Sequence, residues 1–250
     1  MKKRTYSDLL PLGVILLLLI LWEAAVRIFR IPLYVLPAPT DMFETFFTDF
    51  PTLAYHALIT LGEACAGILI SLIIGITVGI LMDAFPMIKK SIYPILVVTQ
   101  TVPVIVLAPI FIIYLGFGLA PKILTVVLMC FFPIVVSFSD GMTQMNQNHI
   151  NLLRSYGGSR WQIYRLVKIP SAMISLLSGL KMAATYSISG AVVGEWIASE
   201  AGLGYYLIHA KNMYMLDSVF ACVLMIVLLS LMMNGLVRLI NHIFMPRHKR

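Results

Sequence analysis

The run ACAGILISLIIGITVGILM, residues 64–82, contains no charged side chain and is long enough to cross a bilayer as one helix. A spanning helix needs about 20 mostly apolar residues, and a soluble core could not hide so much apolar surface from water. Five further runs also lack charges, at residues 9–22, 91–121, 123–139, 182–194 and 218–237. The sequence therefore predicts an all-α integral membrane protein with about six transmembrane helices.

The composition supports this fold class, because 60% of the 250 residues are hydrophobic and only 12% are charged, against about 25% charged in soluble domains. The shorter runs extend across single charges at Glu23 and Lys181, and Lys181 either reaches the interface or faces another helix. We predict one membrane domain over residues 1–250, with its core at 53–242. The predicted spans are residues 9–29, 53–82, 91–115, 121–140, 170–198 and 214–242.

The distribution of basic residues predicts the orientation in the membrane. Of the 18 lysines and arginines, 13 would lie on the side of both termini and 4 on the opposite side, among them Lys122. The positive-inside rule then places both termini in the cytoplasm. The net charge of +7 is spread over several loops, so we read it as a topology signal and expect no nucleic-acid partner.

The cytoplasmic segment at residues 149–169 has the most informative pattern. Apolar residues recur at helical spacing from Ile150 to Tyr156. Gly157 and Gly158 then end that helix, and Ser159 with Gln162 forms an S-x-x-Q capping box that starts a second short helix before Pro170. From periodicity alone, an amphipathic connector lying on lipid headgroups is the simpler interpretation.

The spacing within this segment resembles the cytoplasmic EAA signature of ABC importer permeases. In that signature E-A-A, three residues, Gly and nine residues precede I-x-L-P, and here Gly157 is followed after nine residues by Val167-Lys-Ile-Pro170. Asn151, Leu152 and Leu153 stand where the signature has E-A-A, which is a clear departure. Similar stretches occur at residues 36–39, 158–162, 194–195 and 202–205. The resemblance is closest to the branch serving nitrate, taurine, sulfonates and thiamine precursors.

The resemblance implies a type I ABC importer transmembrane domain whose cytoplasmic coupling helix contacts an ATPase subunit. No G-x4-G-K-[ST] loop is present, so ATP and Mg²⁺ would bind to that partner chain and no cofactor to this one. Further implied partners are a second permease copy, or less readily a related chain, and an extracytoplasmic solute-binding protein at the bacterial plasma membrane. The expected ATPase-coupling residues are Asn151, Leu152, Leu153, Arg154, Tyr156, Gly157, Ser159, Arg160, Trp161 and Pro170.

Polar residues inside the spans are candidates for a translocation path. Gln100 lies near the middle of the third span and should face the bundle interior, either on a solute path or in an interhelical hydrogen bond. Glu63 and Glu195 lie near the outer ends of their spans, where we expect them to be hydrated. The candidate path residues are Gln100, Thr101, Pro103, Ser187, Ser189 and Glu195.

Small residues and cysteines suggest packing and not chemistry. The pairs Gly75-x3-Gly79 and Gly190-x3-Gly194 allow helices to approach closely. Cys65, Cys130 and Cys222 each stand alone in an apolar run, and the five histidines have no ligand spacing, so we predict no metal site.

Two other classes of function remain open: a stand-alone secondary transporter and a membrane-embedded enzyme. Secondary transporters often show inverted repeats, and an enzyme would need clustered His, Asp or Glu at one membrane face; we find neither pattern. The chain is therefore expected not to be an enzyme. For the substrate, the run 100–109 resembles permeases for a pyrimidine thiamine precursor or riboflavin, with taurine, alkanesulfonate or nitrate as the alternative.

Overall fold

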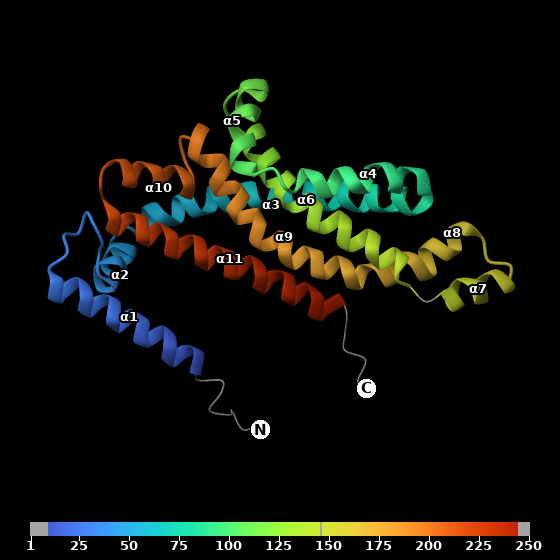
Figure 1. The fold of residues 1–250 in the computed structure, drawn as a ribbon, viewed down its shortest axis with the longest axis horizontal. Coiled ribbons are helices and arrows are strands. Elements are labelled where there is room, and N and C mark those ends of the chain that lie inside the picture. Colours follow the sequence, from blue (N-terminus) through green and yellow to red (C-terminus); the bar gives the residue numbers. More distant parts are fainter. Residues whose placement is uncertain (1–9, 146, 245–250) are drawn as a thin grey trace.

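The computed structural model describes residues 10–145 and 147–244, and every regular element in these ranges is a helix (Figure 1). Five helices are long and apolar enough to cross a membrane, and a bent pair of shorter helices supplies a sixth candidate. The all-α fold with about six spans is confirmed. The basic residues 2–4 and 247–250, on which the predicted orientation partly depends, lie outside the described residues.

Helix α6 (Leu119–Thr143) runs between α3 (Phe50–Ala84) and α9 (Ile169–Ala198), and these three helices form the core of the bundle. The predicted glycine packing is confirmed, because a Cβ on any of the four glycines would meet α6 at 3.0 Å or closer. Along the chain the contacts show that α3 runs parallel to α6 and that α9 runs antiparallel to it. The contacts are Gly75 with Ile134, Gly79 with Phe138, Gly190 with Val126 and Gly194 with Lys122.

The third predicted span is not one helix, which corrects the expectation for residues 91–115. Instead α4 (Pro86–Thr99) and α5 (Val104–Leu115) meet at an angle of 103°. Pro103 has no N–H to donate and keeps the preceding residue out of helical conformation, so the helix cannot continue through it. The hydroxyls of Thr99 and Thr101 donate to the carbonyls of Leu96 and Val98, which partly satisfies the backbone that the break exposes.

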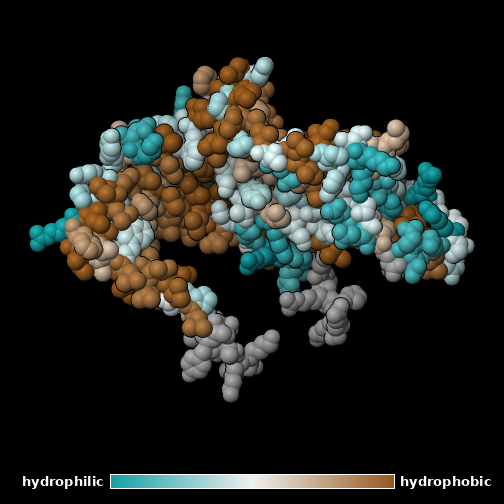
Figure 2. Space-filling view, viewed as in Figure 1, coloured by the Kyte–Doolittle hydropathy of each residue, from teal (hydrophilic) through white to brown (hydrophobic). Residues whose placement is uncertain are grey.

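Helix α1 (Leu10–Phe29) lies away from the core and joins it at one end, beside α2 (Pro39–Thr48) (Figure 1). Only Val26 of α1 is buried, and its surface is almost wholly hydrophobic (Figure 2). Near the junction Arg27 donates to Glu23 at 2.9 Å and to Asp41 at 2.7 Å, so this ion-pair network holds the two helices together. The apolar surface of α1 suits contact with lipid or with another membrane chain.

The segment that the sequence predicts to be cytoplasmic contains α7 (Gln147–Ser155), a glycine break and α8 (Arg160–Ile163). We expected the second short helix to end where the fifth span begins, but α8, the π-helical turn η2 (Tyr164–Lys168) and α9 form one helix over Arg160–Ile197. A proline ring in a regular helix clashes with the carbonyl four residues earlier, and the wider π turn makes room just before Pro170. The remaining helices are α10 (Leu203–Asn212) and α11 (Leu216–Phe244), which pack on α9.

Candidate functional site

Helices α7 and α8 meet at a stiff elbow, as the sequence predicted. Ser159 Oγ accepts from the Gln162 amide at 3.3 Å, and Gln162 Oε1 accepts from the Ser159 amide at 2.7 Å, which completes the capping box. Gly157 has φ of +78°, a conformation that side chains disfavour. The amide of Gly158 donates back to the carbonyl of Leu153 at 2.9 Å. The angle between α7 and α8 is therefore held by local hydrogen bonds.

Most of the predicted coupling residues project from this elbow into the surroundings. The exposed fractions of Leu152, Tyr156 and Trp161 are 57%, 82% and 69%. Large apolar side chains at this exposure, between membrane-spanning helices, form a surface that a partner protein can cover. Leu153 and Gly158 are half-buried because they pack against each other inside the elbow. The other exposed members are Asn151, Arg154, Gly157, Ser159, Arg160 and Pro170.

The predicted path residues fall into two groups. Gln100, Thr101 and Pro103 lie at the break between α4 and α5 and are exposed, so Gln100 does not face the interior of this chain's own bundle as we had expected. The break exposes these residues, although Leu96 before it and Ala108 after it are buried. Ser189 is also exposed, on α9. Ser187 and Glu195 are buried, and the Ser187 hydroxyl donates to the carbonyl of Ala184 at 3.0 Å within its own helix.

Glu195 caps the start of α10. Its Oε2 accepts from the Gly204 amide at 2.6 Å, and its Oε1 accepts from the Thr60 hydroxyl at 2.7 Å. Thr60 Oγ1 in turn accepts from the Leu203 amide at 2.9 Å, and His56 Nδ1 accepts from the Gly202 amide at 3.0 Å. The first amides of a helix have no partner within the helix, so α3 and α9 together supply acceptors for α10.

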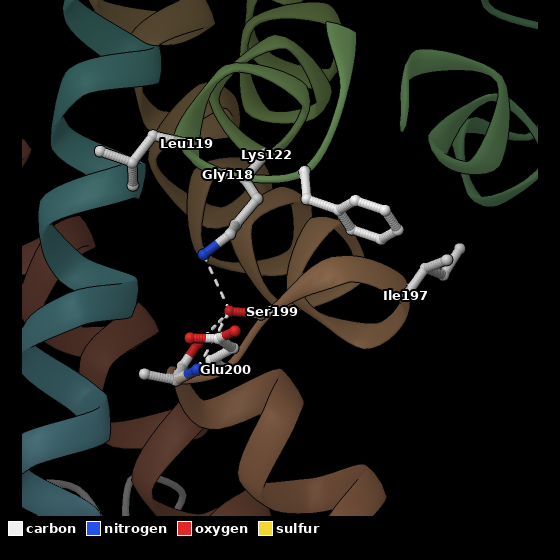
Figure 3. Close-up of a pocket in the computed structure, with 8 residues that line it drawn as sticks. Gly118, Leu119, Lys122, Ile197, Ser199 and Glu200 are labelled. Carbon is white, nitrogen blue, oxygen red and sulfur yellow. Dashed lines mark hydrogen bonds between the residues drawn. The ribbon is translucent and has the colours of Figure 1, made fainter. Parts of the chain in front are cut away.

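Glu63 and Lys122 form a second buried cluster at the end of the bundle where α6 begins. Lys122 Nζ lies 2.8 Å from Glu63 Oε1. It also donates to Ser199 Oγ at 2.8 Å, and Figure 3 shows this hydrogen bond. Only 4% of Glu63, 1% of Glu195 and 7% of Lys122 are exposed. The expectation that Glu63 and Glu195 are hydrated is therefore wrong. The ion pair between Lys122 and Glu63, with the hydrogen bond from Lys122 to Ser199, offsets part of the cost of burying these two charges.

A cavity of about 610 Å³ opens beside this cluster, between the start of α6 and the segment that follows α9 (Figure 3). Phe117, Ile197 and Glu200 are among the residues that line it. Glu200 is exposed, whereas Lys122 is held by Glu63. The cavity therefore presents one hydrated carboxylate and an apolar wall, and the buried pair contributes little free charge to it.

An exposed polar stripe on α9 was only partly anticipated. Ser178, Lys181, Thr185 and Ser189 follow one another at spacings of three and four residues, so they share one face of the helix, and all four are exposed. Asn234 of α11 donates to Thr185 Oγ1 at 2.8 Å. Figure 2 shows hydrophilic residues in the middle of the face on which α9 and α11 lie. The spacing of these polar residues could have revealed the stripe from sequence.

The stripe lies at the depth of the apolar core. Gly179, two residues before Lys181, packs against Pro133, in the middle of the charge-free run 123–139. Within the described ranges of the chain, Lys181 makes no ion pair or hydrogen bond. A cation at this depth is costly in hydrocarbon and normally faces a protein interior or a water-filled cavity. The stripe therefore faces something other than lipid.

Comparisons with known proteins agree with this geometry. The family described as "Binding-protein-dependent transport system inner membrane component" matches residues 67–245. The formylaminopyrimidine transport permease protein ThiX of Halalkalibacterium halodurans is 33% identical, with 99% of each chain covered. The riboflavin transport system permease protein RibX of Chloroflexus aurantiacus is 28% identical, with 92% of this chain and 86% of that protein covered.

A solved structure with the same arrangement of helices is that of the MetNI methionine ABC transporter in an inward-facing conformation. The superposition gives a TM-score of 0.62 at 18% sequence identity and covers 76% of this chain and 97% of the other. At this identity the likeness concerns the fold alone. It agrees with the type I importer architecture that the EAA-like spacing implied.

Proposed function

The chain belongs to the family of binding-protein-dependent transport system inner membrane components, and on that premise we propose that it carries a small solute inward as the transmembrane subunit of an ATP-driven importer. The observation that carries the mechanism is the rigid, exposed elbow at Gln147–Ile163. A movement of the elbow would be transmitted to α9, because α8 and α9 belong to one continuous helix. Both termini would then lie in the cytoplasm, together with the elbow.

The elbow would dock into a cleft of an ATPase subunit. Tyr156, Leu152 and Trp161 are suited to be apolar anchors, since aromatic side chains in desolvated pockets carry much of the energy of an interface. Arg154 and Arg160 are exposed beside them and could pair with carboxylates at the rim. ATP and Mg²⁺ would bind to that partner, whose nucleotide-dependent closure would displace the elbow.

Two copies of the chain would form the translocation path between them. The exposed stripe from Ser178 to Ser189 on α9 supports this arrangement, because polar side chains at mid-depth then face an aqueous path and not lipid. Gln100, Thr101 and Pro103 at the α4–α5 break are exposed as well and would line the same path. Buried Ser187 and Glu195 would hold the lining helices in place and would not touch solute.

Replacing Lys181 by methionine is expected to reduce solute uptake about fivefold or more, the effect of losing roughly 1 kcal/mol of interaction in the path. The side chain has no partner within the described chain, so its removal should leave assembly with the ATPase unchanged. Uptake into proteoliposomes at saturating ATP measures the effect. Lys181→Arg, which keeps the charge, should retain most of the activity, and wild-type uptake by Lys181→Met would exclude the residue from the path.

For the solute, we propose a pyrimidine thiamine precursor first, because the formylaminopyrimidine permease ThiX is similar over nearly the whole chain. Riboflavin is supported by the likeness to RibX, and taurine, alkanesulfonate or nitrate would be carried by the same mechanism. Binding-protein-dependent systems select their solute mainly outside the membrane. Measuring the ligand of the binding protein encoded beside this chain therefore tests the choice directly.

Purification of the membrane complex tests the class of function. An importer subunit should bring down an ATPase subunit in equal amounts, and ATP hydrolysis by the complex should rise when the loaded binding protein is added. A stand-alone secondary transporter or a membrane enzyme would purify without an ATPase. Uptake that continues in vesicles lacking ATP but holding an ion gradient would overturn the proposal.

A further inference from the structure

We infer that Asp83 is a positioning residue that joins the cytoplasmic end of α3 to the helix carrying the elbow, so that movement of the elbow displaces α3 as well as α9. The inference rests on the proposed function, in which an ATPase moves the elbow. Without Asp83, the covalent continuity of α8, η2 and α9 would be the direct route for that movement. With Asp83 present, movement of the elbow also reaches the bundle through the non-covalent contact between Asp83 and η2.

The carboxylate of Asp83 receives two donors from η2. Asp83 Oδ2 accepts from Tyr164 OH at 2.5 Å and from Lys168 Nζ at 2.5 Å. Lys168 Nζ also lies 4.9 Å from the centroid of the Tyr164 ring. Because the side chains of Asp83 and Lys168 are only 6% and 18% exposed, water screens this contact weakly and its charge-assisted hydrogen bonds are strong. We call these three residues the inner latch.

The position of Asp83 in α3 is unfavourable for a carboxylate, which indicates that the residue is acidic because it forms the latch. Asp83 lies in the last turn of α3, which ends at Ala84, and the C-terminal end of a helix dipole disfavours an acidic side chain. Burial adds a further cost to an unpaired carboxylate. Tyr164 and Lys168 are the first and last residues of η2, and π turns occur frequently at functional sites. The hydrogen bonds from Tyr164 and Lys168 thus offset the unfavourable effects of the helix dipole and of burial on the Asp83 carboxylate.

The outer end of α3 is hydrogen-bonded to the start of α10, so a movement of α3 would also reach α10. His56 and Thr60, near the start of α3, hold the amides of Gly202 and Leu203 at the beginning of α10. A helix rises about 1.5 Å per residue, so the stretch of α3 from Asp83 back to Thr60 and His56 is about 35–40 Å long, which exceeds the roughly 30 Å hydrocarbon core of a bilayer. A displacement applied at Asp83 would therefore reach both α3 and the outer helix α10.

The ratio of solute imported to ATP hydrolysed tests the inference. The complete complex would be reconstituted in proteoliposomes with its binding protein, using formylaminopyrimidine as the solute probe. Asp83→Asn is expected to lower the ratio about two- to fivefold, the size of effect typical of changes within a coupling network, with unchanged docking of the ATPase. The exchange variant Asp83→Lys with Lys168→Asp restores an ion pair that the helix dipole of α3 favours, and should recover most of the ratio.

A second measurement follows the latch without any solute. Spin labels on cysteines introduced at Phe85 and Leu166, both exposed, would report the distance between the end of α3 and η2 in the complex, with Cys65, Cys130 and Cys222 replaced. In the otherwise wild-type chain we expect one narrow distribution that ATP does not broaden. Asp83→Asn should broaden it, and the exchange variant should narrow it again.

The outcomes separate the inner latch from the proposed function. A wild-type ratio and a narrow distribution in Asp83→Asn would overturn the latch alone. A lower ratio that the exchange variant fails to restore would mean that Asp83 serves only stability, and it would overturn the latch as well. A wild-type complex that hydrolyses ATP but never takes up any solute supplied by its binding protein would overturn the proposed function, and the inference with it.

Discussion

Replacement of Tyr156 by glutamate is expected to abolish ATP-driven uptake while leaving the chain folded in the membrane. The Tyr156 side chain is 82% exposed and makes no hydrogen bond, ion pair or ring contact within the described ranges, so the change acts mainly on whatever docks there. An aromatic anchor at the centre of an interface contributes about 2 kcal/mol or more, which corresponds to roughly a 30-fold loss of affinity. A buried glutamate without a partner adds to that loss.

Co-purification of the ATPase and uptake in vesicles would both fall, and the amount of permease in the membrane fraction would not. Tyr156→Phe is the matched control, because it keeps the ring and should retain most of the uptake. If Tyr156→Glu binds the ATPase and imports solute at the wild-type level, the elbow is not the docking surface. The segment would then be better described as a connector lying on the lipid headgroups.

Replacement of Lys122 by methionine is expected to destabilise the fold by about 3–5 kcal/mol, the cost of removing one partner of a buried ion pair. The variant leaves the Glu63 carboxylate, 3% exposed as a side chain, without its cation, and Glu63 Oε2 already has no hydrogen-bond partner. The loss would appear as a lower midpoint of thermal unfolding in detergent and as a smaller amount of monodisperse protein.

The variant that also carries Glu63→Leu separates the charge from the packing. With both partners removed, no charge is left buried, and apolar replacements of buried pairs are often neutral or stabilising. The double variant should therefore recover most of the stability that Lys122→Met loses. A double variant less stable than the single one would show that the pair is not what holds this end of the bundle.

Local rules in the sequence were sufficient for the approximate number of spans and for the elbow, but not for the third span, which is broken between Thr99 and Val104. The number of spans follows from the lengths of the charge-free runs, since each helix satisfies its own backbone hydrogen bonds in lipid. The capping box of Ser159 and Gln162, and the positive φ of Gly157, depend on residues within a few positions of each other. The EAA-like spacing, taken together with the number of spans and the similar stretches elsewhere in the chain, was likewise sufficient to indicate the family.

The break at Gln100–Pro103 and the continuous helix through Pro170 show how far such local rules extend. Both prolines were visible in the sequence, yet one separates two helices at 103° and the other follows a π turn in an unbroken helix. A proline in the sequence indicates only that one backbone hydrogen bond of a regular helix is missing. Whether the helix then bends, ends or widens depends on what packs beside it.

The amino-acid sequence by itself determined the fold class, the family and the geometry of the elbow, because those depend on apolar length and on neighbours in the chain. The tertiary structure alone decided which charges meet: Lys122 pairs with Glu63, 59 positions away, and Lys168 with Asp83, 85 positions away. Such pairs depend on how each helix is rotated about its axis and how deep it lies against the next one. A hydropathy run is nearly the same for every rotation, so only the packed bundle shows which polar groups are buried together and which, like Lys181, are left facing outward.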